Sequence, residues 1–344
     1  MKSDVERAGL ITAISCWFAV LLAVALHLSD PWWAGISAWI IASPSPAKLW
    51  QKGALRLVGT VAGCWLGYEL GIHLEGNPPL QILALFGLTT VSTYLRFRSD
   101  YEYAWVIGGV SALLVFSFSL DQSQSLYAAA HYRAYEIACG VLSATLGPVL
   151  LRPFFSWSNP TPEPAAPLGG TLHGDHDSAL TIALIGGGTV VLIVLLWSWF
   201  DLPSLQQSLI TAVAVLNRDL AATRLRARLR LFGCLVGGAA GLVCAVFIVD
   251  SFALWSLLLI GGLAVFSRLH LSGHRWAYSG TQGGVAFLMV LVTGGGPPPT
   301  ALPVIHRLAG LLVGVVVLLG VTQIVRFFSR PSPAPEPAIG SPCV

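Results

Sequence analysis

Charged side chains inside apolar segments are the residues of this sequence best suited to chemistry. Arg133 and Glu136 lie three residues apart, so on a helix they share one face. Arg307 follows Arg133 by 174 residues in a similar segment, with Gly310 at the position equivalent to Glu136. A buried arginine can receive an anion and a buried carboxylate can take up a proton; the alternative for Arg133 and Glu136 is a mutual salt bridge. Glu69 is a second candidate for a proton site, unless it is an exposed interfacial acid.

Two short apolar segments supply the other candidates for a binding site. Residues 32–47 are interrupted by prolines and contain Trp39, which can stack on an aromatic acid. Residues 202–216 contain Gln206 and Gln207. Short or interrupted segments at matching places in two repeats are typical of a transporter's substrate site. The alternative is that both are tilted or half-inserted helices without a ligand.

The composition indicates that these segments lie in a membrane. Of the 344 residues, 55% are hydrophobic and 10% are charged, and the mean hydropathy is +0.74. A soluble domain has about 25% charged residues, so this chain cannot cover a globule with polar surface. Its apolar segments are expected to be helical, because lipid offers the backbone no hydrogen-bond partner. The twelve predicted spans are 9–28, 32–47, 54–72, 80–95, 103–120, 131–151, 179–200, 202–216, 229–249, 252–268, 276–293 and 304–326.

An arginine followed by three glycines occurs once in each half of the sequence, with a spacing of 174 residues. Glycines four residues apart give a helix a smooth face that lets a neighbouring backbone approach closely. The motif therefore predicts one central packing helix in each half. The arginine before each set of glycines is expected to extend to the lipid head groups. The repeated residues are Arg56, Gly59, Gly63 and Gly67, then Arg230, Gly233, Gly237 and Gly241.

The repeat predicts an all-α polytopic membrane protein with twelve transmembrane helices. Six spans per half give two parallel six-helix repeats, related by a pseudo-twofold axis along the membrane normal. With the N-terminus in the cytoplasm, all lysines and arginines except Arg133 and Arg307 fall in cytoplasmic segments. Both termini are therefore expected in the cytoplasm. The predicted parts are a first repeat at 1–155, a Pro/Gly-rich cytoplasmic linker at 156–178, a second repeat at 179–329 and a disordered tail at 330–344.

Several classes of function are not supported by any motif. The sequence has no Walker motif, no Ser/His/Asp arrangement and no zinc signature. We therefore expect neither an enzyme nor an ATP-driven pump, and neither a metal site nor a cofactor. The basic stretch 218–230 fits anionic lipid head groups rather than nucleic acid.

The stretch 31–67 resembles the opening of the fusaric acid resistance family, also called the aromatic acid exporter family. In that family a tryptophan-containing corner leads into a short helix, a proline turn and an Arg-x-x-Gly-Thr-x-x-Gly helix. The matching residues here are Trp32, Trp33, Pro44, Pro46, Arg56, Gly59, Thr60 and Gly63, with Arg133 and Gly140 later in the first half. The second half matches at Arg230, Gly233, Gly237, Arg307 and Gly314, but lacks the tryptophan corner and the turn prolines.

The resemblance implies export of aromatic or amphipathic weak acids across the bacterial inner membrane, often beside a periplasmic adaptor protein. The favoured reading is a secondary efflux transporter for aromatic or other organic weak acids, driven by protons. The alternatives are a channel-like anion permease and a non-transporting membrane component of an envelope complex. The expected partners are small organic anions and membrane lipids, with an adaptor protein and a homo-oligomer left open and nucleic acid excluded.

Overall fold

The computed structural model describes residues 2–121, 125–151, 154, 176–247, 251–292 and 302–328. This part of the chain forms twelve helices and no strand. Most of the predicted linker and the whole predicted tail lie outside the described residues. The helices are α1 (Lys2–Ala25), α2 (Trp32–Ile41), α3 (Pro46–Leu74), α4 (Pro78–Arg98), α5 (Glu102–Asp121), α6 (Leu126–Leu151), α7 (His176–Phe200), α8 (Leu205–Val215), α9 (Leu220–Phe247), α10 (Phe252–His270), α11 (Ala277–Leu291) and α12 (Leu302–Phe328).

Eight of these helices are long and apolar enough to cross a membrane, namely α1, α4, α5, α6, α7, α9, α10 and α12. A full span at each of the twelve predicted segments is not confirmed, because α2, α8 and α11 have only 10, 11 and 15 residues, and the 29-residue α3 is not among the eight. Ten residues of helix extend about 15 Å, half the thickness of a hydrocarbon core. α2 ends at Ile41, two residues before Ser43. Ser43 precedes Pro44, and a residue that precedes proline avoids the helical conformation.

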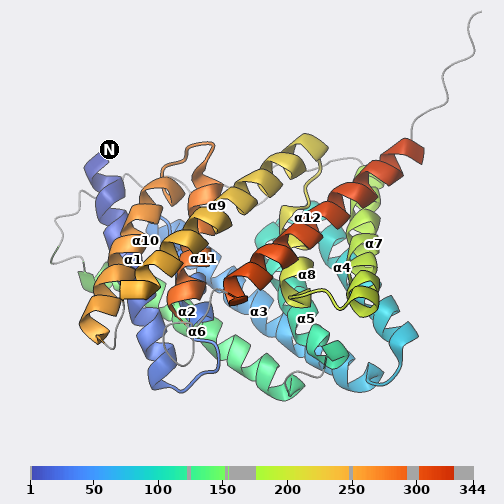
Figure 1. Ribbon diagram of the computed structural model, residues 1–344, viewed down its shortest axis with the longest axis horizontal. Helices are drawn as coiled ribbons and strands as arrows, with labels where there is room; N and C mark the ends of the chain where they lie inside the picture. The colour runs from blue at the N-terminus through green and yellow to red at the C-terminus, as the bar shows by residue number, and fades with distance from the viewer. Residues whose placement is uncertain are drawn as a thin grey trace, which may run out of the picture.

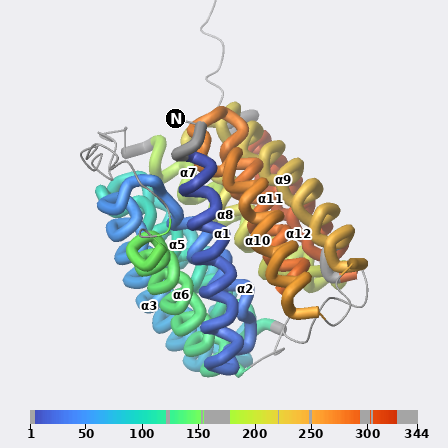
Figure 2. The backbone as a smooth tube through the Cα atoms, turned by 90° about the vertical axis from the view of Figure 1, so that its left-hand side faces the viewer, coloured from blue at the N-terminus to red at the C-terminus, as the bar shows by residue number. Residues whose placement is uncertain are grey.

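The two halves of the sequence form two bodies that lie side by side. In Figure 2, α3, α5 and α6 lie on one side and α9 to α12 on the other. Contacts within one half recur in the other: α3 packs on α5 as α9 packs on α11, and α2 packs on α6 as α8 packs on α12. Contacts between the halves also recur, since α4 packs on α7 as α10 packs on α1. Figure 1 places the start of α1 and the end of α12 at the same edge of the bundle.

The glycines of the repeated motif lie against the backbone of a neighbouring helix. A Cβ atom at Gly63 would collide with the carbonyl of Gly108, and one at Gly237 with the carbonyl of Gly283. Such a close approach gives the van der Waals contact that holds helices together in lipid. Three others behave alike, since Gly59 faces the backbone of Ala104, Gly67 that of Ala112 and Gly233 that of Ser279, whereas Gly241 faces the side chain of Val290.

The arginines that precede these glycines do not reach the membrane surface, so that prediction is wrong. Arg56 is 3% exposed and Arg230 is 5% exposed. The Nε of Arg56 donates to Ser37 Oγ at 2.7 Å, and Nη1 of Arg230 donates to Gln282 Oε1 at 2.8 Å. Both side chains turn inward, where neighbouring helices supply acceptors to part of each guanidinium, while Arg230 Nε has none.

The short helices α2 and α8 are each held at the C-terminal end by a side chain from the opposite half. Nη1 of Arg96 donates to the carbonyls of Val213 and Leu216, at 3.2 and 3.1 Å. Nε2 of His270 lies 3.1 Å from the carbonyl of Trp39. Positions 96 and 270 are 174 apart, as are 39 and 213, so the two contacts are equivalent in the repeat. They supply donors to carbonyls near the ends of the two helices, where backbone partners run out, although the Trp39 carbonyl also accepts from the N–H of Ala42.

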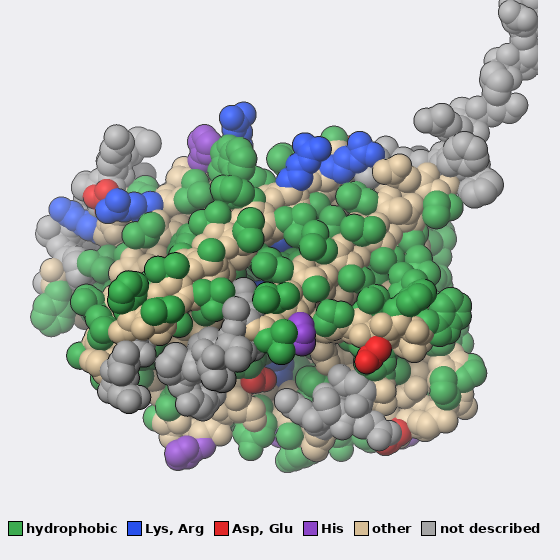
Figure 3. All heavy atoms as spheres, viewed as in Figure 1, with side chains coloured by type: hydrophobic (Ala, Val, Ile, Leu, Met, Phe, Trp, Pro, Cys, Tyr) green, Lys and Arg blue, Asp and Glu red, His purple; other side chains and the backbone are tan. Residues whose placement is uncertain are grey.

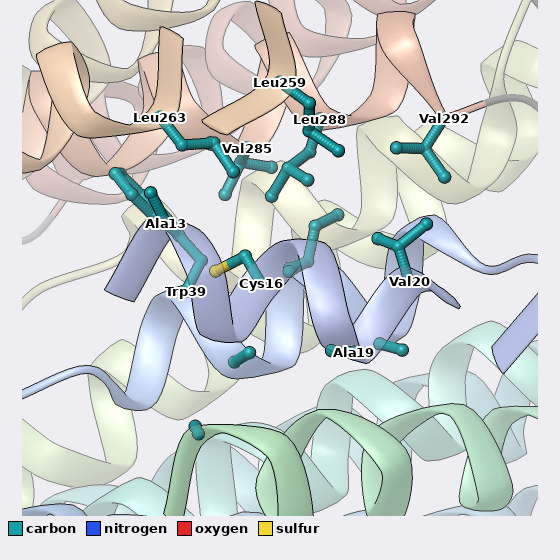
Figure 4. Close-up of a cluster of buried hydrophobic side chains, with 14 of the residues drawn as sticks. Ala13, Cys16, Ala19, Val20, Trp39, Leu259, Leu263, Val285, Leu288 and Val292 are labelled. Atoms are coloured by element: carbon teal, nitrogen blue, oxygen red, sulfur yellow. The ribbon is translucent and has the colours of Figure 1, made fainter. Parts of the chain in front are cut away.

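The largest buried cluster joins α1 and α2 to α10 and α11. Figure 4 shows Cys16 and Val20 of α1 on the side of Leu259, Leu288 and neighbouring side chains of the second half. The cluster therefore forms part of the contact between the halves.

Candidate functional site

A cavity of about 530 Å³ lies between the two halves. Its wall is made by the α1–α2 connection, α2, α5 and α6 from the first half, and by the start of α8, α11 and α12 from the second. Figure 3 shows a basic and an acidic side chain recessed in a hollow near the middle of one face. Five of the candidate residues meet here, from positions far apart in the sequence: Arg133, Glu136, Gln206, Gln207 and Arg307.

The cavity wall follows the repeat, since many of its residues come in pairs 174 positions apart. The pairs are Asp30 and Ser204, Trp32 and Gln206, Trp33 and Gln207, Val115 and Met289, and Arg133 and Arg307. The two sides differ in chemistry, because the first half contributes carboxylates and indoles where the second contributes a hydroxyl and amides. Glu136 lines the cavity, and its equivalent is Gly310.

Arg133 is held in place by an aromatic ring and does not form the salt bridge considered from the sequence. Arg133 is 9% exposed, and its Cζ lies 3.4 Å from the centroid of the Trp33 ring. A guanidinium over an indole face gains a cation–π interaction. Within the part of the chain that the structure describes, no ion pair joins Arg133 to Glu136. The charges of Glu136 and Asp30 nevertheless act on it.

Glu136 fixes the corner between α1 and α2. Its Oε1 accepts a hydrogen bond from the backbone N–H of Asp30 at 2.7 Å. Asp30 lies in the connection between the two helices, where burial raises the pKa of its carboxyl group and the nearby Arg133 opposes that rise. The cavity therefore contains a second carboxyl group that the sequence reasoning did not select. The Asp-Pro pair before Trp32 was the signal that could have found it.

Arg307 has a different environment from Arg133. Its Nε and Nη1 are buried and have no hydrogen-bond acceptor. The groups that act on it are the Cys234 thiol and the guanidinium of Arg230, with no carboxylate among them. A buried charge without a counter-charge is costly, so this side of the cavity favours an anion.

Unpaired donors gather at this cavity. Among the described residues, five buried side-chain nitrogens have no acceptor, and four of them belong to residues that line the cavity: Trp32 Nε1, Arg133 Nε, Arg307 Nε and Arg307 Nη1. The fifth is Arg230 Nε. Buried polar groups normally have a partner. A matching ligand is therefore rich in hydrogen-bond acceptors, as a carboxylate is.

Two of the candidate residues lie elsewhere. Trp39 is fully buried in the core, where its ring stacks on His270 with centroids 4.8 Å apart and its Nε1 donates to the carbonyl of Thr281 at 3.0 Å. Glu69 lies near the end of α3, part-exposed, with its Oε2 3.7 Å from Nδ1 of His73. Neither lines the cavity. Trp39 is drawn inward because α2 packs against α11, and it is Trp32 and Trp33 that face the cavity.

A second cavity, of about 740 Å³, runs along α3, α4 and α5. Its lining has no charged side chain and includes the surface-exposed Val58, Leu66 and Val91. An apolar recess of this kind suits lipid or other apolar groups, so the cavity with the two arginines is the candidate functional site.

Comparison with known proteins gives matches over both halves. Residues 10–170 match the profile described as "Fusaric acid resistance protein family", and residues 180–321 match the one described as "Fusaric acid resistance protein-like". No solved structure matches the chain significantly.

Similar curated proteins are named "p-hydroxybenzoic acid efflux pump subunit AaeB". The one from Edwardsiella tarda is 29% identical over 146 residues, which is 39% of this chain and 22% of the relative. The one from Escherichia coli O1:K1 is 27% identical over 157 residues, which is 40% of this chain and 24% of the relative. The one from Citrobacter koseri is 26% identical over 153 residues, which is 41% of this chain and 23% of the relative. The chain thus covers less than a quarter of the length of these relatives.

Proposed function

The chain belongs to the fusaric acid resistance protein family, and on that premise we propose that it is a secondary transporter exporting aromatic or other organic weak acids. The observation that carries the proposal is the cavity in which Arg133 and Arg307 present buried nitrogens without an acceptor. Similar proteins named as efflux pump subunits for p-hydroxybenzoic acid support the substrate class.

We further propose that the helices form two parallel six-helix repeats about a pseudo-twofold axis along the membrane normal. The recurrence of helix contacts after six elements and the cavity residues paired at 174 positions support this arrangement. The termini are proposed to be cytoplasmic, in a bacterial inner membrane. On the face shown in Figure 3, most of the visible lysines and arginines gather along the edge near which α1 begins and α12 ends, which agrees with the positive-inside rule. On this orientation the cavity opens away from the cytoplasm.

In the proposed binding mode, the carboxylate of the ligand contacts the polar side of the cavity and its aromatic ring contacts the apolar side. An arginine binds a carboxylate through its planar fork and stays charged at any working pH. The aromatic body of the ligand packs against apolar residues such as Phe118 and Met289 on the cavity wall. Glu136 is the proposed proton site that couples export to a proton gradient. A periplasmic adaptor protein and a homo-oligomer are the proposed partners, in line with the word "subunit" in the names of the relatives.

The test is transport of labelled aromatic acids into inverted membrane vesicles that contain the chain. We expect accumulation of p-hydroxybenzoate when a pH gradient is imposed, and a loss of about tenfold to a hundredfold with Arg307→Gln, since a hydrogen bond to a charged partner is removed. Arg268→Gln is the matched control, because Arg268 is exposed and pairs with Glu6 at the surface.

Two other outcomes would contradict this function. Flux that only equalises the concentrations, at any pH gradient, would identify a channel-like permease. If no acid of the panel moves at all, a non-transporting role in an envelope complex is the better description.

A further inference from the structure

The four charged residues of the cavity are distributed unequally. Among the residues that line it, Arg133, Arg307, Asp30 and Glu136 carry formal charges, and these add up to zero when all four are ionised. Both carboxylates come from the first half and act on Arg133. The equivalent positions in the second half hold Ser204 and Gly310. Arg307 therefore faces the cavity without a carboxylate, and Arg133 faces it beside two.

We propose that Asp30 and Glu136 form a charge selector, which restricts the ligand to one negative charge and directs that charge to Arg307. The proposal rests on the proposed function in taking the ligand to be an organic anion. It adds two specificity-determining residues and a ligand class, aromatic acids with a single anionic group.

The side of Arg307 has what a single carboxylate needs. Its Nε and Nη1 have no acceptor, and the groups acting on it are a thiol and another cation. Gln207, which also lines the cavity, is equivalent to Trp33 and offers an amide where the other half offers an indole face. A ligand carboxylate placed here neutralises the positive charge of Arg307, on which no carboxylate of the described residues acts.

The side of Arg133 repels a second carboxylate. A ligand with two anionic groups long enough to reach both arginines would bring its second group beside Asp30 and Glu136, and like charges in contact disfavour binding strongly. The Glu136 carboxylate cannot easily move away. Glu136 is tied to the backbone N–H of Asp30 at 2.7 Å, and Arg133 is fixed on the Trp33 ring at 3.4 Å. Among the described residues Arg133 forms no ion pair with either carboxylate, so it acts on them through its charge alone.

The experiment is equilibrium binding to the purified full chain in detergent, with three probes of similar shape. Benzoate carries one charge, terephthalate carries two at opposite ends, and benzamide carries none. We expect the parent protein to bind benzoate and to bind terephthalate at least tenfold more weakly. Asp30→Asn should improve terephthalate binding by about tenfold or more, because the repulsion of one close like charge is removed.

A second selector variant and a control variant distinguish an effect on charge selection from a general effect of mutation on binding. Glu136→Gln is the second selector variant and should also improve terephthalate binding, so the proposal stays testable if one variant does not fold. Asp201→Asn is the control, since Asp201 lies in the equivalent connection between α7 and α8 but does not line the cavity. It should leave both affinities unchanged. Arg307→Gln should weaken benzoate binding by about tenfold to a hundredfold, and Arg133→Gln should weaken it less.

The outcomes distinguish the selector from the proposed function. If the parent binds terephthalate as tightly as benzoate, or if neither selector variant gains terephthalate affinity, the selector is wrong while benzoate binding still supports an exporter of organic acids. If the parent binds neither anion, the selector and the proposed function fail together.

Discussion

At the scale of single residues, identical side chains at equivalent positions have different roles. Arg133 and Arg307 are related by the repeat, yet one lies on an indole beside two carboxylates and the other has buried donors without an acceptor. The difference comes from the neighbours, Trp33 and Glu136 in one half and Gln207 and Gly310 in the other. Residue type alone therefore does not determine which arginine receives the ligand.

The titration of Asp30 leads to a prediction about pH. Burial raises the pKa of Asp30, so its carboxyl group takes up a proton at a higher pH than an ordinary aspartic acid does. The groups that face it are the guanidinium of Arg133 and the carboxyl group of Glu136. Protonation removes a negative charge from the cavity, so affinity for an anion that never protonates should rise as the pH falls.

The measurement is binding of benzenesulfonate over a pH series that runs from neutral pH down to the ordinary aspartic acid pKa of about 3.9. The parent should bind more tightly at the lower pH, and Asp30→Asn should bind tightly throughout with a flatter profile. A profile for Asp30→Asn as steep as that of the parent would show that Asp30 is not the titrating group.

At the scale of elements, the helices meet through glycine faces and capped helix ends. Each central pair, α3 with α5 and α9 with α11, depends on the absence of side chains at three glycines. The short helices depend on side chains from the opposite half for their last carbonyls, α2 on His270 and α8 on Arg96. The glycine contacts and the hydrogen bonds at the helix ends each form between two helices, so neither is a property of a single helix.

Leucine at either central glycine should destabilise the protein. Gly63→Leu and Gly237→Leu each place a side chain where a neighbouring carbonyl already lies, and overpacking costs about 1–3 kcal/mol or more. Thermal unfolding in detergent should show a lower midpoint and the expression level should fall. Gly320→Leu is the control, because a Cβ atom there meets nothing within 4 Å; an equal loss in this control would mean that leucine itself, and not the close helix contact, is responsible.

Removal of the charged cap should loosen α8. Arg96→Leu deletes the hydrogen bonds to Val213 and Leu216 and the contact with Glu102. Hydrogen bonds to charged groups contribute about 1.5–3 kcal/mol each, so the unfolding midpoint should fall clearly. Arg268→Leu, which removes an exposed ion pair, should change it little. Equal midpoints for the parent and Arg96→Leu would show that packing alone holds the end of α8.

At the scale of the whole molecule, two halves of like topology enclose a cavity of unlike chemistry. The contacts of one half recur in the other, and the contacts between α4 and α7 and between α10 and α1 join them. The cavity lies where the halves meet, so pairs of residues 174 positions apart line it together. Any movement of one half against the other changes the distance between the two arginines.

The orientation in the membrane is tested with alkaline phosphatase, which is active only outside the cytoplasm. A fusion after residue 328 should be inactive, because the end of α12 lies on the same edge as the start of α1, and most basic side chains visible in Figure 3 lie along that edge. A fusion within the 201–204 connection should be active. The reverse pair of results would place the cavity on the cytoplasmic side and would rule out the proposed direction of opening.

The amino-acid sequence alone determined the membrane class, the repeat and the glycine faces, because composition and spacing along one helix specify these. It also selected Arg133, Glu136, Gln206, Gln207 and Arg307, which the fold brings to one cavity, since a buried charge or amide is visible in an apolar segment. It did not reveal the inward turn of Arg56 and Arg230, the burial of Trp39 or the place of Asp30. Only the tertiary structure decided those, because each depends on partners from other helices, several of them in the opposite half.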